Sequence, residues 1–143
     1  GQKEDKAGKS IIKKLEECGV SITEYVVIPD ENEIIQEKVI QYQKQDIDLI
    51  IYTGGTGLSI RDVTPEALLP LLERRIPGVE EAIRTYGQDR TPYSMLSRSV
   101  AGTIGNTLVL ALPGSTNGAK ESMDAIFPAV LHIFRILKGA RHD

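Results

Sequence analysis

The sequence is short of residues that could cross-link the chain or hold a metal. It contains one cysteine, Cys18, and no tryptophan. A single thiol cannot form an internal disulfide, which is typical of a protein from a reducing compartment, and we expect a cytoplasmic protein. The two histidines, His132 and His142, both lie near the C-terminus. A histidine-based metal centre is therefore not expected.

Strong charge of one sign and long apolar runs are also missing. The net charge is −3, whereas nucleic-acid binding needs a basic field to displace counterions, so no nucleic-acid partner is expected. No apolar run approaches the ~20 residues that a membrane-spanning helix requires. The first ten residues are mostly polar and charged, so we expect no signal peptide and no membrane partner. The length predicts a single domain, residues 1–143.

Predicted helices and strands alternate along the chain. Hydrophobic spacing, β-rich runs and turn residues locate them. In order, they are helix 10–17, strand 21–28, a helix opening at Asp30, strand 48–52, a helix with Thr64 as N-cap and Pro65 at its first position, helix 79–86, strands 97–104 and 107–112 joined by the hairpin turn Gly105-Asn106, and helix 119–137. The last helix is apolar on most of its circumference, which fits either a buried helix or a subunit interface.

This order predicts an α/β fold: three layers, α/β/α, with an open, mostly parallel sheet and a closing hairpin. Ligands of such folds bind at the C-terminal ends of the strands. Three loops follow strands here: Pro29-Asp30, residues 53–62 and residues 113–115. They are far apart in the sequence, yet the fold class would bring them to one rim.

The segment Thr53-Gly54-Gly55-Thr56-Gly57 is the richest signal for a site. Glycines permit positive φ and close approach, so successive N–H groups can surround an anion, and the threonines add hydroxyl donors. The pattern is neither a P-loop nor a dinucleotide fingerprint. A tight strand-to-helix turn is the alternative. We expect a phosphorylated ligand here because the segment follows a buried strand.

Asp62 lies shortly after this glycine segment. A carboxylate beyond a phosphate cradle is well placed to hold Mg²⁺, which prefers oxygen ligands and bridges carboxylate to phosphate. The residue by itself fits a turn aspartate with local hydrogen bonds better. Both interpretations stay open at this point.

Asp30 has a strong structural explanation as well. With Glu33 three residues later it resembles a capping box, and such a cap is typically worth ~1 kcal/mol. Only its expected place on the same rim as Asp62 supports a second role.

Pro113-Gly114-Ser115 ends the last strand, and the N–H groups of the helix start that follows could take a second anion. A plain strand-to-helix turn explains that segment equally well.

Several motifs occur together in one order and cover nearly the whole chain. They are Asp5-Lys6-Ala7-Gly8, Pro29-Asp30, Thr53-Gly54-Gly55-Thr56-Gly57, Arg61-Asp62-Val63-Thr64-Pro65-Glu66, Leu96-Ser97-Arg98 and Leu112-Pro113-Gly114-Ser115. In the identity and order of these motifs, the sequence resembles the molybdopterin adenylyltransferase family of molybdenum-cofactor biosynthesis, to which a domain of gephyrin also belongs.

The resemblance implies Mg²⁺-dependent transfer of AMP from ATP to the terminal phosphate of molybdopterin, with release of pyrophosphate. Aspartates matching Asp30 and Asp62 matter for activity in that family. We expect Asp62 to be the metal ligand and Asp30 to place substrate. The residues expected to bind substrate or nucleotide are Asp5, Gly8, Thr53, Gly54, Gly55, Thr56, Gly57, Pro113, Gly114 and Ser115. Members are typically trimers, so a homotrimer is expected.

The sequence departs from the family pattern in two places. The family has a β-strand before the Asp5 motif, so we expect this domain to lack its first β-strand. We therefore expect the sequence to be a piece of a longer or fused protein. After Ser115 the family commonly has a proline, whereas Thr116-Asn117-Gly118 follow here.

Two further functions are compatible with the same motifs. A non-catalytic module could hold or deliver the pterin, and equilibrium binding without turnover would distinguish it. A role in molybdenum insertion is less favoured, because insertion proteins embed this domain in a much longer chain. A Rossmann oxidoreductase is not expected, because its glycine fingerprint and ribose-binding acid are absent.

Overall fold

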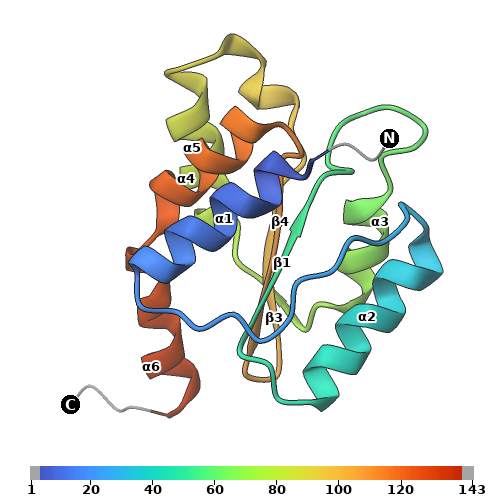
Figure 1. Ribbon diagram of the computed structural model, residues 1–143, viewed down its shortest axis with the longest axis vertical. Coiled ribbons are helices and arrows are strands. Elements are labelled where there is room, and N and C mark those ends of the chain that lie inside the picture. The colour runs from blue at the N-terminus through green and yellow to red at the C-terminus, as the bar shows by residue number, and fades with distance from the viewer. Residues whose placement is uncertain (1–3, 140–143) are drawn as a thin grey trace.

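The computed structural model describes residues 4–139, and His142 lies outside that range. The elements follow one another along the chain (Figure 1). They are α1 (Lys6–Glu17), α2 (Asn32–Lys44), β1 (Leu49–Thr53), α3 (Thr64–Leu68), η1 (Leu69–Leu71), β2 (Arg74–Arg75), α4 (Pro77–Gln88), η2 (Pro92–Leu96), β3 (Val100–Ile104), β4 (Thr107–Leu112), α5 (Thr116–Ile126), η3 (Ala129–His132) and α6 (Ile133–Leu137), where η marks a 3-10 helix.

The sheet of the described residues has the order β1-β4-β3-β2. β1 runs parallel to β4, with Ile51 opposite Leu110 and Thr53 opposite Leu112. β3 and β4 form the predicted antiparallel hairpin, and the two-residue strand β2 pairs antiparallel with β3. The turn between β3 and β4 needs positive φ, and Gly105 supplies it at +56°.

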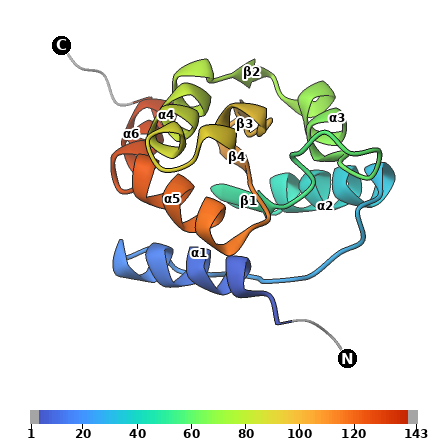
Figure 2. The same cartoon turned by 90° about the horizontal axis from the view of Figure 1, so that it is seen from above.

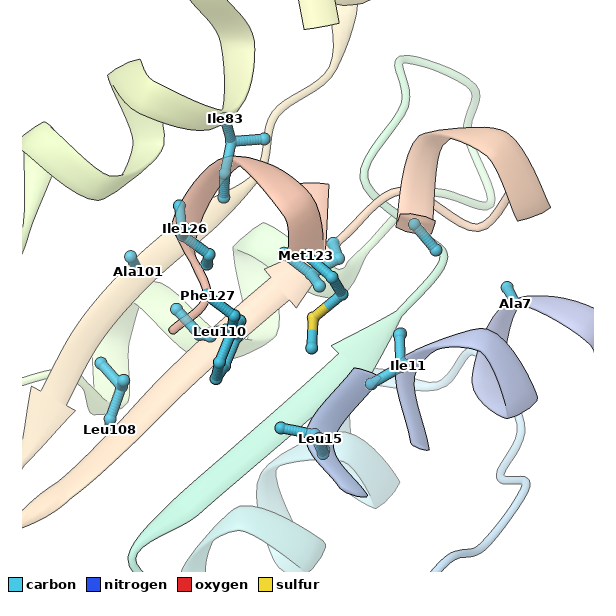
Figure 3. Packing of buried hydrophobic residues seen from close by; sticks show 12 residues of the cluster. Ala7, Ile11, Leu15, Ile83, Ala101, Leu108, Leu110, Met123, Ile126 and Phe127 are labelled. Carbon is cyan, nitrogen blue, oxygen red and sulfur yellow. The ribbon is translucent and has the colours of Figure 1, made fainter. Parts of the chain in front are cut away.

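Helices cover both faces of this sheet, so the predicted three-layer α/β/α fold is confirmed (Figures 1 and 2). Every residue of β4 is buried, as expected of a strand between two helical layers. Its leucines face one core, which α1, α4 and α5 cover, whereas Val109 and Ala111 face a second core under α2 and α3. Figure 3 shows the first core, where Met123 of α5 and Ile11 of α1 pack near Leu110 of β4.

The prediction of a strand at residues 21–28 is wrong. This segment has no regular secondary structure, and most of its side chains are exposed. A β-rich sequence becomes a strand only when its N–H and C=O groups pair with a neighbour, and within residues 4–139 β1 pairs on one side only, with β4. Between β1 and residues 20–29 lies a cavity of about 530 Å³. The expectation of a missing first strand stays a prediction.

The prediction of one helix over residues 119–137 is also wrong in its continuity. Pro128 lacks the N–H that a helix interior needs, and the chain forms α5, η3 and α6 in succession. Ala119, Met123 and Ile126 of α5 are buried, whereas α6 has no buried residue and Ile136 is 54% exposed. No helix of the described residues is long and apolar enough to cross a membrane.

The buried carboxylate of Glu80 connects α4 to strands β2 and β3. Glu80 is 2% exposed and accepts hydrogen bonds from Nε and Nη2 of Arg75, each at 3.0 Å, and from the N–H of Ala101 at 3.1 Å. Arg84 Nη2 lies 3.7 Å from the same carboxylate. A buried charge is tolerated when it is paired and hydrogen-bonded in this way.

We predict that Glu80→Ala lowers the free energy of unfolding by about 2–3 kcal/mol, because it leaves the buried Ala101 N–H and two guanidinium groups without their acceptor. Glu81→Ala, at the exposed neighbouring position of α4, is the matched control and should change it by less than about 0.5 kcal/mol. Urea denaturation measures both, and equal losses would contradict a special role for Glu80.

Candidate functional site

The glycine segment begins where β1 ends and has the backbone that its sequence predicts. Gly54 has φ +99° and Gly55 has φ +68°, a region that residues with a side chain rarely adopt. The N–H of Gly54 donates to Leu112 O at 2.9 Å, and the N–H of Thr64 donates to Gly55 O at 3.1 Å. The loop is therefore held from the end of β4 on one side and from the start of α3 on the other.

Thr64 does not cap α3 as predicted. The N-cap is Val63, and it makes no side-chain cap bond. The hydroxyl of Thr64 instead donates to Gly54 O at 2.9 Å. A methyl group on Gly55 would lie 2.2 Å from that hydroxyl oxygen. The threonine thus packs against the glycine loop, where only a residue without a side chain fits.

Three successive amides of the glycine loop are left without a hydrogen bond in the described part of the chain. Within residues 4–139, the N–H groups of Gly55, Thr56 and Gly57 have no hydrogen-bond acceptor. Thr56 is buried, and its hydroxyl lies 3.5 Å from that of Ser97. Consecutive unbonded N–H groups after αL glycines are the feature that makes backbone concavities bind anions.

The loop after β4 touches this glycine loop directly. Thr53 Oγ1 donates to Pro113 O at 2.9 Å, and a methyl group on Gly114 would lie 3.0 Å from the Gly54 Cα. Ser115 is the N-cap of α5 and accepts from the N–H of Gly118 at 3.0 Å. The cap satisfies only one of the donors that a helix start leaves open. Two of the three predicted loops therefore meet at one rim.

Asp5 and Gly8 lie at the start of α1. Asp5 is the N-cap and accepts from the N–H of Gly8 at 2.9 Å, and the Tyr25 hydroxyl donates to its other oxygen. That hydrogen bond to the carboxylate raises the pKa of the Tyr25 phenol. The position of Tyr25 beside Asp5 was missed by sequence reasoning, because no local pattern links residues twenty apart.

Asp30 is not the helix cap that the capping-box pattern predicts. The N-cap of α2 is Glu31, without a side-chain cap bond. Asp30 is exposed, and no residue of the described range bonds to its carboxylate. It lines the 530 Å³ cavity together with Gly8, Thr53 and Thr64. Its carboxylate therefore has no hydrogen bond within the described residues that would explain an aspartate at this position.

Asp62 makes the local hydrogen bonds of a turn aspartate. Its Oδ2 accepts from both the N–H and the hydroxyl of Ser59, each at 2.9 Å. The same oxygen lies 2.6 Å from where a methyl group on Gly57 would be. No hydrogen bond within residues 4–139 reaches Oδ1. The turn interpretation is thus observed, and it leaves one oxygen for a further ligand.

The donor set fits Mg²⁺ only in combination with a substrate. Among the described residues there is no group of three or more histidine, cysteine or acidic side chains that could hold a metal ion. Mg²⁺ is usually held by one or two carboxylates, substrate phosphates and water. One free oxygen of Asp62 beside an amide cradle for phosphate meets that pattern.

Arg98 belongs to the motif Leu96-Ser97-Arg98, but the sequence alone indicated no role for it. Its guanidinium donates to Gly57 O at 2.8 Å and to Asp62 O at 2.9 Å, and it pairs with Glu66. The hydrogen bond from Arg98 lowers the pKa of Glu66, which keeps that carboxylate charged. No spacing in the sequence could indicate contacts that span about forty residues.

Taken together, unbonded amides, positive-φ glycines and a capped helix start lie at the ends of two parallel strands, which is where α/β domains bind their ligands. A family model described as a probable molybdopterin binding domain matches residues 1–132, and the chain belongs to this family. The resemblance to a protein family of molybdenum-cofactor biosynthesis, which the sequence motifs indicated, is thereby confirmed.

Similar proteins carry consistent names. The molybdenum cofactor biosynthesis bifunctional protein of Chlorobaculum tepidum is 39% identical over 142 residues, which cover 99% of this chain and 46% of that protein. Gephyrin of Dictyostelium discoideum is 44% identical over 125 residues, covering 87% of this chain and 17% of gephyrin. The chain thus spans less than half of either relative.

A solved structure matches over most of both chains. The crystal structure of the molybdopterin biosynthesis enzyme MoaB from Thermus thermophilus superposes with a TM-score of 0.88 and 39% identity, covering 96% of this chain and 87% of that one. At this identity the likeness concerns sequence as well as fold. It agrees with the family to which residues 1–132 belong.

We predict that Gly55→Ala destabilises the protein by at least about 1–3 kcal/mol, because the new side chain must adopt positive φ and displace the Thr64 hydroxyl. Gly78→Ala is the control, since its new methyl group would meet nothing within 4 Å in the first turn of α4. That variant should be neutral or more stable by less than about 1 kcal/mol. Thermal unfolding compares the two, and a Gly55→Ala protein as stable as the parent would refute the loop geometry.

Proposed function

We propose that this domain catalyses adenylyl transfer from ATP to the phosphate of molybdopterin, giving adenylylated molybdopterin and pyrophosphate. One observation carries the proposal: the N–H groups of Gly55, Thr56 and Gly57 are unbonded, and Oδ1 of Asp62, whose carboxylate lies next to Gly57, has no hydrogen-bond partner in the described residues. Membership of a molybdopterin-binding family supplies the pterin as the phosphorylated ligand.

The reaction joins two phosphates, and the site is suited to that problem. An oxygen of the pterin phosphate attacks the α-phosphorus of ATP, a new P–O bond forms, and the bond from the α-phosphorus to pyrophosphate breaks. Several negative charges approach one another, so fixed N–H donors lower the barrier where charge concentrates. The free amides of the glycine loop and the open N–H groups at the start of α5 are such donors.

Two carboxylates take separate roles in the proposal. Asp62 would hold Mg²⁺ through Oδ1, while Ser59 keeps Oδ2 in place. When bound, the ion supplies charge neutralisation and orientation of the phosphates. Asp30 lines the same cavity as Thr53 and would place the pterin or the nucleotide. No covalent nucleophile is needed for this transfer.

The proposal extends to setting and partners. The bifunctional relative joins a domain similar to this one to further sequence, so we propose that the domain works with other molybdenum-cofactor proteins in the cytoplasm. A homotrimer also stays a prediction, with the apolar residues around Ile136 of α6 as the surface it would use.

We predict that Asp62→Asn lowers the rate of adenylyl transfer by roughly 100-fold or more, because the amide cannot neutralise a cation at the phosphates. Asp30→Asn should also lower it, with the larger effect on KM if that residue places substrate. Asp89→Asn, at the exposed C-cap of α4, is the matched control. The assay incubates protein with molybdopterin and Mg-ATP and follows adenylylated pterin and pyrophosphate.

The outcomes separate the two functions. Full turnover by Asp62→Asn would exclude its metal role. A parent protein that binds molybdopterin in equilibrium dialysis but forms no pyrophosphate would replace catalysis by a carrier function. The observation favouring that second function is the turn hydrogen bonding of Asp62, which gives the carboxylate a structural task that requires no metal.

A further inference from the structure

The loop that carries Asp62 has little of its own to hold it in place. Residues 58–61 are all exposed, with Leu58 at 68% and Ile60 at 99%. Within the loop, Asp62 N–H donates to Ser59 O at 3.0 Å, and the Asp62 carboxylate accepts from Ser59. These bonds shape the turn but do not attach it to the sheet. An exposed loop without core contacts is expected to open easily.

One arginine bridges the two ends of this loop. Arg98 Nε donates to Gly57 O at 2.8 Å, Nη2 donates to Asp62 O at 2.9 Å, and Nη1 bonds Glu66 of α3. The backbone N–H of Arg98 adds a bond to Thr56 O at 2.7 Å. The planar fork of a guanidinium can bind several fixed acceptors at once, which a lysine ammonium cannot reproduce.

The backbone on both sides of Arg98 is held by Arg84 of α4. The carbonyls of Ser97 and Ser99 accept from Arg84 Nη1 at 3.4 and 3.5 Å. Arg84 in turn lies beside the buried Glu80, and Ser99 is 1% exposed. The contacts therefore run without interruption from α4 through residues 97–99 to the loop that holds Asp62.

We propose that Arg98 is a positioning residue, which clamps residues 57–62 so that the free oxygen of Asp62 faces the phosphate cradle. This inference rests on the proposed function for its catalytic consequence, but not for the clamp. Arg98 acts through Asp62 and touches neither phosphate nor metal. It serves to hold a carboxylate within the small tolerance that phosphoryl chemistry requires.

We predict that Arg98→Lys speeds amide hydrogen exchange of Ser59 and Asp62, whose N–H groups make the hydrogen bonds of the loop, by roughly tenfold or more, since the ammonium cannot hold both carbonyls. It should lower kcat by roughly 10–100-fold, raise the Mg²⁺ concentration for half-maximal rate, and leave KM for ATP within about twofold at saturating Mg²⁺. Arg90→Lys is the matched control, because Arg90 stacks on Tyr86 and bonds Tyr86 O, and it should change none of these.

Two results would overturn the clamp. One is unchanged exchange of the Ser59 and Asp62 amides in Arg98→Lys. The other is a large rise in KM for ATP with kcat preserved, which would mean that Arg98 binds the nucleotide as a charge. A parent without adenylyl transfer would overturn the proposed function instead, and the exchange measurement would still decide the clamp. If Arg98→Lys unfolds, Glu66→Gln removes only the exposed ion pair and should raise exchange there by a smaller factor, roughly two- to threefold.

Discussion

The parallel pairing of β1 with β4 is the constraint on which the candidate site depends. With Thr53 opposite Leu112, the two strands end together, and the loops that follow them emerge side by side. The pairing continues one residue beyond the sheet, where Gly54 N–H reaches Leu112 O and Thr53 Oγ1 reaches Pro113 O. A shift of one residue in register would turn buried side chains outward and separate the two loops.

Elements whose cause is local could be predicted from the sequence. The hairpin strand 107–112, the turn at Gly105 and the buried stripes of the helices each depend on nearby residues. The predictions that were wrong had causes that were non-local or were overlooked in the sequence. Residues 21–28 have strand-forming side chains but no partner for their backbone, and Pro128 divides the last helix. The caps assigned to Asp30 and Thr64 fit the sequence pattern, yet Thr64 makes a tertiary contact with Gly54 instead.

The candidate site divides in the same way. The positive φ of Gly54 and Gly55 and the meeting of their loop with Pro113-Gly114 follow from glycine content and fold class. The surroundings of the carboxylates do not. The bonds between Asp62 and Ser59 are local and match the turn interpretation of the sequence, whereas Arg98, which holds the loop, lies 36 residues further along the chain. Sequence reasoning therefore described the backbone of the glycine loop better than the contacts that hold the Asp62 loop.

The turn hydrogen bonds of Asp62 and a metal role are compatible. A carboxylate has two oxygens, and here Ser59 occupies only Oδ2. Fixing that oxygen removes rotamer freedom before any ligand arrives, so a cation at Oδ1 would not have to offset the full entropy of ordering the side chain. The same reasoning applies to the free amides of residues 55–57, which the glycine backbone holds in place without a ligand. A turn aspartate beside a preorganised cradle is thus a starting point for binding Mg²⁺-phosphate rather than an argument against it.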